Sequence, residues 1–331
     1  MALLEVRNLS VGIRQKNKYL PAVRGIDFDI NAGEIIALAG ESGGGKTLSA
    51  LAIPRLLPPV AKILSGEITF NSVPLFECAE KELRRIRGRQ ISMIFQEPRQ
   101  SLNPLIRIGT QITESLELHG EKNRLRLKRE ALEMLEAMGF DEAEKIYRAY
   151  PHQLSLGMCQ RVMIAIAAIC KPRLLIADEA AASLDQETQN HILDILSRMN
   201  REYGTAILYI SHDLHLIRSF CSRCLIMYGG KIVEEGPGEK IISSPQHPYT
   251  QSLISSIPGR EQRGNPLPVM PGRGPSIEDS FSGCPFAPRF PRAQSLCREA
   301  FPPPSDMGGG QRVYCHYPEN GQHQSPGGGN V

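Results

Sequence analysis

The chain has 331 residues, of which 41% are apolar and 22% are charged, so it is long enough to bury one large core or two modest ones. Its net charge of +3 is too small to suggest a nucleic-acid partner, and basic residues cluster only briefly, as in residues 84–87. The amino terminus lacks the features of a signal peptide, and the longest apolar run, residues 162–170, is too short to cross a bilayer. These features predict a cytosolic protein, unless a partner holds it at a membrane.

Three segments near the amino terminus alternate apolar and polar residues, as strands with one buried face do. They are residues 3–11, 22–30 and 66–70, and turn residues separate them. Residues 34–39, between the second and the third, form an apolar run that is typical of a buried parallel strand. The pattern predicts an antiparallel layer beside a parallel core.

A glycine-rich loop follows that apolar run directly. It fits G-x-x-x-x-G-K-[ST] in full, and a helix is expected to begin near Lys46 and to end before Pro54. In such a loop the backbone N–H groups wrap a polyphosphate, Lys46 reaches the β- and γ-phosphates, and Thr47 offers a hydroxyl to Mg²⁺. The predicted phosphate-binding residues are Gly40, Glu41, Ser42, Gly43, Gly44, Gly45, Lys46 and Thr47. The alternative, an ordinary glycine turn, leaves the flanking strand and helix unexplained.

The middle of the chain changes from a strand pattern to a helix pattern. Residues 90–95 form an apolar run that predicts a buried strand ending at Gln96. From residue 98 to about residue 153, apolar residues recur at helical spacing, as at Leu132, Leu135 and Met138. We interpret this part as an inserted helical subdomain.

Two further buried strands are predicted after the insertion. Residues 174–177 end in Asp178 and Glu179, and residues 205–210 end near His212. Strands that alternate with helices form a parallel sheet with right-handed crossovers, and ligands bind at the carboxyl ends of its strands. We therefore expect these polar side chains to lie along one edge of the sheet, beside the phosphate loop.

The last third begins with a hairpin and then changes character. Residues 225–234 contain a Gly-Gly turn between two apolar runs, which predicts two antiparallel strands. Beyond residue 256 the chain is rich in Pro, Gly and Ser, which predicts a small loop-rich appendage with a disordered end. We find no internal repeat.

Asp178 and Glu179 are the predicted carboxylates of a hydrolytic site. Asp178 is placed to hold Mg²⁺, and Glu179 is placed to accept a proton from an attacking water. By itself, such a pair after an apolar run often only caps the next helix. Beside a phosphate loop, the hydrolytic interpretation is favoured.

A third motif, LSLGMCQR at residues 154–161, begins the apolar helix. Ser155 is placed as the N-cap, and the first turn attracts anions through the helix dipole. The alternative is a capped helix without a further role.

Together these motifs resemble the nucleotide-binding subunits of ABC transporters, and the likeness covers nearly the whole chain. Residues 154–161 are similar to the ABC signature, Gln96 falls at the Q-loop, Asp178 and Glu179 at the end of Walker B, residues 183–185 at the D-loop, and His212 at the switch histidine. The segments ISMIFQEP and HPYT, at residues 91–98 and 247–250, resemble the peptide-importer subfamily of dipeptide, oligopeptide and nickel systems.

The resemblance implies an α/β P-loop NTPase (ABC ATPase) fold with a parallel core sheet, an antiparallel β subdomain, an inserted helical subdomain and a small loop-rich C-terminal appendage. The expected ATPase domain covers residues 1–255, with the helical subdomain at about 97–160. Residues 256–331 are expected to form an extension of the oligopeptide-importer type with a disordered tail.

Roles for single residues are implied by the same resemblance. Gln96, with Thr47 and Asp178, would contact Mg²⁺, and His212 would contact the γ-phosphate. Ser155 and Gly157 would complete the nucleotide site of a partner subunit, and Asp185 would link the two sites. Glu179, His212 and Gln96 are thus the implied catalytic residues, with ATP and Mg²⁺ as the ligands.

The chain departs from the family pattern at three places. Leu156 stands where the signature usually has a glycine, and Ala180 and Ala181 replace the usual Pro-Thr pair. Ile13 stands where an aromatic residue normally stacks on adenine, so apolar contact or Tyr19 would hold the base. We hypothesise from Leu156 that the two nucleotide sites of the assembled pair are unequal, as a heterodimer would allow.

Eight cysteines without a secretory signal suggest reduced thiols or a metal site. We interpret Cys78, Cys159, Cys170 and the Cys221-x-x-Cys224 pair as packing residues. In the appendage, the family often carries four cysteines for an iron–sulfur cluster. Here Cys284, Cys297 and Cys315 remain while Phe290 replaces the second cysteine, so a 4Fe–4S cluster and a structural knot are both open, with His316 as a substitute ligand.

The favoured function is the ATPase subunit of an importer for dipeptides or oligopeptides. Its implied partners are a second ABC ATPase subunit, two transmembrane permease subunits and an extracytoplasmic solute-binding protein, with this chain peripheral at the cytoplasmic face of the plasma (inner) membrane. The alternatives are a nickel or other small-solute importer ATPase, a soluble ABC ATPase acting on DNA repair or ribosomes, and a regulatory ATP-binding module that does not hydrolyse ATP.

Overall fold

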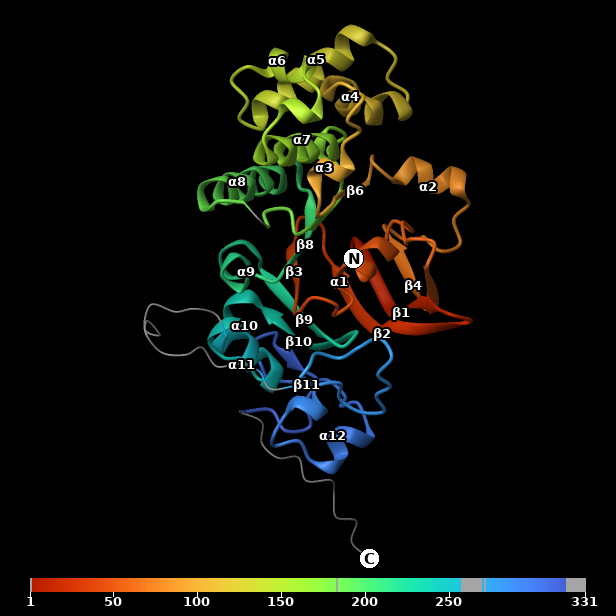
Figure 1. Cartoon of the computed structure of the whole chain (residues 1–331), viewed down its shortest axis with the longest axis vertical. Helices are drawn as coiled ribbons and strands as arrows, with labels where there is room; N and C mark the ends of the chain where they lie inside the picture. Colours follow the sequence, from red (N-terminus) through yellow and green to blue (C-terminus); the bar gives the residue numbers. More distant parts are fainter. Residues whose placement is uncertain (1, 183, 257–269, 271, 320–331) are drawn as a thin grey trace, which may run out of the picture.

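The structure is a computed structural model that describes residues 2–182, 184–256, 270 and 272–319. The predicted disordered tail after residue 319 and residue 183 of the D-loop lie outside these residues. In the described part of the chain no helix is both long enough and apolar enough to span a membrane. Two sheets and a set of helices form the body of the molecule, with helices α4 to α6 at one end and the C-terminal extension at the other (Figure 1).

The amino-terminal sheet is antiparallel, as its alternating sequence predicts. Its strands follow the order β2-β1-β4-β5, with the bounds β1 (Leu4–Gln15), β2 (Lys18–Ile30), β4 (Ala61–Phe70) and β5 (Val73–Pro74). Strands β1, β2 and β4 are longer than the predicted segments because the strand pairing continues into the polar turns. Arg14 of β1, for example, pairs with Tyr19 of β2.

The second sheet is the core of the molecule and is mixed. Its order is β11-β12-β10-β9-β3-β8-β7-β6, and the pairs from β9 to β6 are parallel. The bounds are β3 (Ile35–Ala39), β6 (Ile91–Ile94), β7 (Leu174–Asp178), β8 (Ala206–Ser211), β9 (Arg223–Tyr228), β10 (Lys231–Pro237), β11 (Ser305–Asp306) and β12 (Arg312–Val313). The strands predicted at residues 34–39, 90–95, 174–177 and 205–210 are confirmed, as is the hairpin of β9 and β10.

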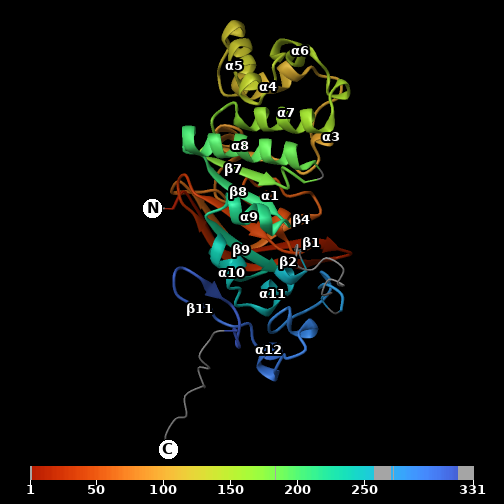
Figure 2. The ribbon, with the colours of Figure 1, turned by 90° about the vertical axis from the view of Figure 1, so that its left-hand side faces the viewer.

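The helices divide between the core and the insertion. They are α1 (Lys46–Ala52), α2 (Glu80–Ile86), α3 (Pro98–Ser101), α4 (Ile108–Leu118), α5 (Arg124–Ala137), α6 (Ala143–Arg148), α7 (Leu156–Ala168), α8 (Gln186–Tyr203), α9 (Leu214–Phe220), α10 (Gly238–Ser243), α11 (Pro248–Ser255) and α12 (Ser295–Glu299). Helix α1 ends before Pro54, as predicted. The predicted helical insertion corresponds to α3 through α6, which lead into α7 (Figure 2).

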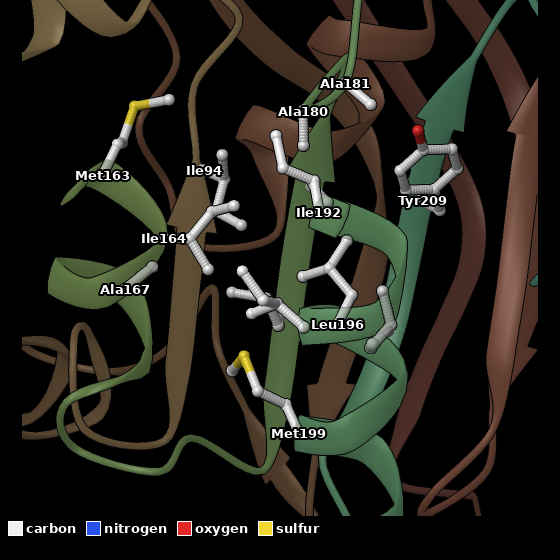
Figure 3. Close-up of a cluster of buried hydrophobic side chains, with 14 of the residues drawn as sticks. Ile94, Met163, Ile164, Ala167, Ala180, Ala181, Ile192, Leu196, Met199 and Tyr209 are labelled. Carbon is white, nitrogen blue, oxygen red and sulfur yellow. The ribbon is translucent and has the colours of Figure 1, made fainter. Parts of the chain in front are cut away.

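Both faces of the parallel strands are apolar and pack against different layers. Along β3, Ile36 and Leu38 join the core formed with the antiparallel sheet and α1, whereas Ala37 and Ala39 join the core formed with α7 and α8. Successive side chains of a strand point to opposite faces, so a run without polar residues predicts burial on both. Figure 3 shows the second of these cores, where side chains of α7 and α8 meet β6 and β7.

The C-terminal extension continues the core sheet. Strand β12 pairs with β10, and β11 pairs with β12, so residues far beyond 256 are hydrogen-bonded to the ATPase core. The buried Glu234 of β10 accepts hydrogen bonds from the backbone N–H groups of Gln246 and His247 and from the side chain of Gln311. The domain boundary near residue 256 stays a prediction.

Candidate functional site

The phosphate loop connects the end of β3, at Ala39, to the start of α1, at Lys46. Gly40 has a φ of +143°, and a Cβ added there would lie 2.1 Å from the carbonyl oxygen of Met227. Gly45 caps α1 with a φ of +97°. These two positions need glycine because a side chain would meet backbone or strain the turn, which explains the glycine spacing in physical terms.

Lys46 is the first residue of α1 and is buried. Its ammonium donates hydrogen bonds to the carbonyl oxygens of Gly40 and Glu41, both at 2.8 Å. Burial lowers the pKa of Lys46, and the nearby carboxylates of Glu179 and Asp178 oppose that shift. The loop therefore holds its lysine folded across its own backbone, with two acidic groups close by.

Asp178 ends β7 and is 2% exposed. Burial raises its pKa, and the neighbouring Thr47 hydroxyl and Lys46 ammonium act in the opposite sense. Its Oδ1 atom is buried without a hydrogen-bond partner. An unpartnered carboxylate oxygen beside a hydroxyl is a donor set that suits Mg²⁺, so these residues fit the ion that the sequence predicts.

The carboxylate of Glu179, the next residue, contacts the side chains of Gln96 and His212, the two other predicted catalytic residues. Gln96 Nε2 donates to Glu179 Oε2 at 2.7 Å, and His212 Nδ1 lies 3.2 Å from Glu179 Oε1. Glu179 has a φ of +50°, an uncommon conformation for a side chain of this size. Three residues that are 83 and 33 positions apart in sequence thus meet at one carboxylate.

A cleft of about 540 Å³ opens over this cluster and extends toward the antiparallel sheet. Of the predicted site residues, those lining it are Ile13, Ser42, Gly43, Gly45, Lys46, Thr47, Gln96 and Glu179. Tyr19, the alternative contact for a base, does not line the cleft, and the ammonium of Lys62 lies 4.1 Å from the centre of its ring. Of these two residues, Ile13 lines the cleft, and its contact with a base stays a prediction.

Ser155, Gly157 and Asp185 form a separate group outside this cleft. Ser155 caps α7 by accepting from the N–H of Met158, and Asp185 caps α8 by accepting from the N–H of Thr188. A Cβ on Gly157 would lie 3.2 Å from the Thr188 methyl group, so the starts of the two helices are in contact. The pKa of Asp185 is lowered by its hydrogen bond from the Thr188 backbone.

Ala180 and Ala181, which replace the family's Pro-Thr pair, are packing residues. They are 1% and 0% exposed and lie near Ile192 of α8 in the core of Figure 3. Small side chains at this point allow α8 to approach the end of β7 closely.

The cysteines of the extension share one small cavity. Cys284, Cys297 and Cys315 line a space of about 20 Å³ with His247 and Phe290, enough for about one water molecule. Among the described residues, no group of three or more His, Cys, Asp or Glu side chains is placed to hold a metal ion. A four-iron cluster takes four thiolates, so three thiols with a phenyl ring in the same cavity do not fit it and favour the structural knot.

The remaining cysteine predictions concern packing and a substitute ligand. Cys221 and Cys224 are buried in the core, and burial raises the pKa of both thiols. His316, the predicted substitute ligand, lines the same cavity as the three cysteines, and its Nε2 atom lies 3.0 Å from the carbonyl oxygen of Ala300.

One group of residues that lines the cleft was not predicted from the sequence. Pro275, Ser276 and Ile277 of the extension line it, together with Arg24 of β2. Arg289 of the extension also forms an ion pair with Glu41 of the phosphate loop at 3.0 Å. A local motif search could not find these residues because no motif joins them to the loop.

Comparison with known proteins agrees with this geometry. The ABC transporter family matches residues 23–182, and the family described as the oligopeptide/dipeptide transporter C-terminal region matches residues 233–297. A dimeric structure of the ATP-binding cassette MJ0796, in a post-hydrolysis state with ADP and Pi, has a TM-score of 0.65 at 26% identity and covers 71% of this chain and 98% of that one.

Curated relatives are similar over almost their whole length. The oligopeptide transport ATP-binding protein AppD of Bacillus subtilis is 41% identical over 98% of this chain and 99% of its own. The oligopeptide transport ATP-binding protein OppD of Escherichia coli is 39% identical over 96% of this chain and 94% of its own. The chain therefore belongs to the family of ATP-binding subunits of oligopeptide and dipeptide ABC transporters.

Proposed function

We propose that the chain is the ATP-hydrolysing subunit of an ABC importer that takes up dipeptides or oligopeptides through partner membrane subunits. The observation that carries the proposal is the meeting of Gln96 and His212 at Glu179, beside the phosphate loop. The relatives AppD and OppD are oligopeptide transport ATP-binding proteins, which favours peptides over nickel and transport over a soluble ABC ATPase.

Glu179 is the proposed general base. One of its oxygens would accept the proton of the water that attacks the γ-phosphorus of ATP. In the present arrangement both oxygens are already engaged, one by Gln96 and one by His212. Binding of ATP would give these two side chains another partner in the γ-phosphate, which frees the carboxylate to orient water.

Thr47 and Asp178 are the residues that would hold Mg²⁺, with Gln96 nearby. When bound, the ion neutralises charge on the β- and γ-phosphates. Lys46 would turn from the carbonyl oxygens of Gly40 and Glu41 to the phosphates, a change that exchanges two neutral acceptors for charged ones.

A second groove is the proposed docking place of the permeases. It has a volume of about 640 Å³ and is lined by Arg89, Leu116, His119, Met134 and Tyr203 among others, between the helical insertion and the core. Strand β6 begins beside Arg89 and ends just before Gln96. In the proposal, a displacement at the Arg89 end of this short strand would shift Gln96 at its other end and so couple docking to the nucleotide site. In this proposal the chain is peripheral, at the cytoplasmic face of the membrane, and works with an extracytoplasmic solute-binding protein.

Uptake measurements test the proposed function. Proteoliposomes that hold the chain with its permease subunits, its partner ATPase and the binding protein are expected to accumulate a labelled oligopeptide only with ATP. Lys46→Ala should abolish accumulation because it removes the phosphate contact, whereas Lys81→Ala, at an exposed site on α2, should not. ATP-dependent accumulation of nickel without peptide, or fractionation of the chain with ribosomes, would contradict the proposal.

The proposed assembly is a heterodimer with unequal nucleotide sites. Leu156 is half-buried at the first position of α7, next to Gly157, where the contact with Thr188 leaves little room. A branched side chain there would crowd a phosphate presented by the partner subunit.

The change Leu156→Gly is expected to raise ATP turnover of the assembled complex several-fold. Leu125→Gly is a matched control, because this leucine lies in the first turn of α5 and is 83% exposed. Steady-state phosphate release measures both variants. An unchanged rate in Leu156→Gly would mean that the signature leucine does not limit the partner's site.

A further inference from the structure

The nucleotide cleft has a wall that comes from the C-terminal extension. We call residues 275–279 the strap. Pro275, Ser276 and Ile277 of the strap line the same cleft as Ile13 of β1 and Ala22 of β2. In Figure 1 this part of the extension, in blue, runs beside the ends of β1 and β2.

Hydrogen bonds hold the strap against the antiparallel sheet. Arg24 donates to the backbone carbonyl of Asp279 at 2.7 Å, and Gln15 is hydrogen-bonded to the side chain of Glu278. Within the strap, the Asp279 carboxylate accepts from the N–H of Ser276 at 2.7 Å and so closes a tight turn. The turn presents Ile277 at a fixed place in the cleft.

A second attachment joins the extension to the phosphate loop. Arg289, whose side chain is 9% exposed, forms an ion pair with Glu41 of the loop. Gly274 lies close enough that a Cβ there would be 3.3 Å from a Glu41 carboxylate oxygen. The extension is therefore fixed at both ends of the cleft, at the loop and at the sheet.

Ile277 is half-buried, and it belongs to neither of the two hydrophobic cores found among the described residues. Ile13 of β1 lines the same cleft and is an aliphatic residue that can contact a base but not stack on it. Two aliphatic side chains, one from β1 and one from the strap, give the cleft an apolar surface that suits a flat, largely apolar ring.

We propose that the strap is part of the nucleotide site, with Ile277 and Ile13 holding the adenine ring between them. This inference rests on the proposed function, since it assumes that ATP is the ligand. The base would be held by the extension and by β1, while the phosphates are held by the loop. Nucleotide affinity would then depend on residues that lie about 230 positions after the phosphate loop.

Binding of ATP compared with binding of inorganic tripolyphosphate tests the strap, because the second ligand has no base. In calorimetry on the full-length chain with Mg²⁺, Ile277→Ala is expected to bind ATP about fivefold more weakly, which is about 1 kcal/mol. Its affinity for tripolyphosphate should match the wild type. Ile277→Phe should bind ATP several-fold more tightly, because an aromatic ring stacks on the base.

Leu296→Ala is the matched control, since this leucine lies on α12, outside the cleft, and is 41% exposed. It should bind both ligands as the wild type does. Equal affinity of Ile277→Ala and wild type for ATP would overturn the inference, and so would an equal loss for both ligands, which would place the effect at the phosphate loop. A wild-type chain that bound tripolyphosphate but not ATP would overturn the proposed function together with the strap.

Discussion

Replacing Glu179 with glutamine is expected to lower ATP turnover about a thousandfold and to leave ATP binding in place. The amide keeps the size of the side chain and one oxygen acceptor, but it cannot take a proton from the attacking water, and general-base catalysis contributes on the order of 10² to 10⁴ in rate. Binding should persist because the phosphate contacts come from Lys46 and the loop backbone.

Phosphate release measures the turnover in an assembled complex whose partner ATPase carries an inactive nucleotide site, so that only the site of Glu179 contributes, and calorimetry with ATP measures the binding. Glu202→Gln is the matched control, because this glutamate lies in the last turn of α8 and is exposed. Turnover within tenfold of wild type in Glu179→Gln would show that another group takes the proton, and the assignment of Glu179 would be wrong.

The second large effect is expected on stability, from Glu234→Ala. The carboxylate of Glu234 is 0% exposed and accepts from the N–H groups of Gln246 and His247, at 2.8 and 3.0 Å, and from Gln311 at 2.8 Å. Removing it takes the acceptor from two buried backbone N–H groups, while Gln311 keeps its second bond, to the carbonyl oxygen of Ser244. Each unsatisfied buried group costs about 1 to 3 kcal/mol. We expect a loss of about 3 to 5 kcal/mol in the free energy of unfolding.

Urea denaturation followed by circular dichroism measures this loss. Glu239→Ala is the control, because the residue is exposed on α10 and its replacement should change stability by no more than about 0.5 kcal/mol. Since Gln311 belongs to the extension, proteolysis of the extension should also become faster in Glu234→Ala. A loss below about 1 kcal/mol would mean that water satisfies the donors, and the network would not be what ties the extension to the core.

Many features of the fold could be predicted from the sequence because local patterns determine them. The phosphate loop can be recognised without coordinates because it has glycine at the two positions that need it. At Gly40 and Gly45 a Cβ would meet backbone atoms or strain the turn. The same is true of the apolar strands, since burial on both faces removes polar residues from the run. In a parallel sheet the carboxyl ends of the strands lie at one edge, so Gln96, Glu179 and His212 are expected to lie close together there. The structure confirms that they are neighbours.

What the sequence by itself determined is thus the loop, the parallel core and the acidic pair, each encoded within a few neighbouring residues. Only the tertiary structure decided that Ile277 faces the cleft, that Tyr19 does not, and that Glu234 receives donors from the extension. The contacts of Ile277 and Gln311 join segments separated by long stretches of chain, and the second depends on how strands β10 and β12 pair. No local periodicity records such a pairing, because the partner residues are selected by packing in three dimensions.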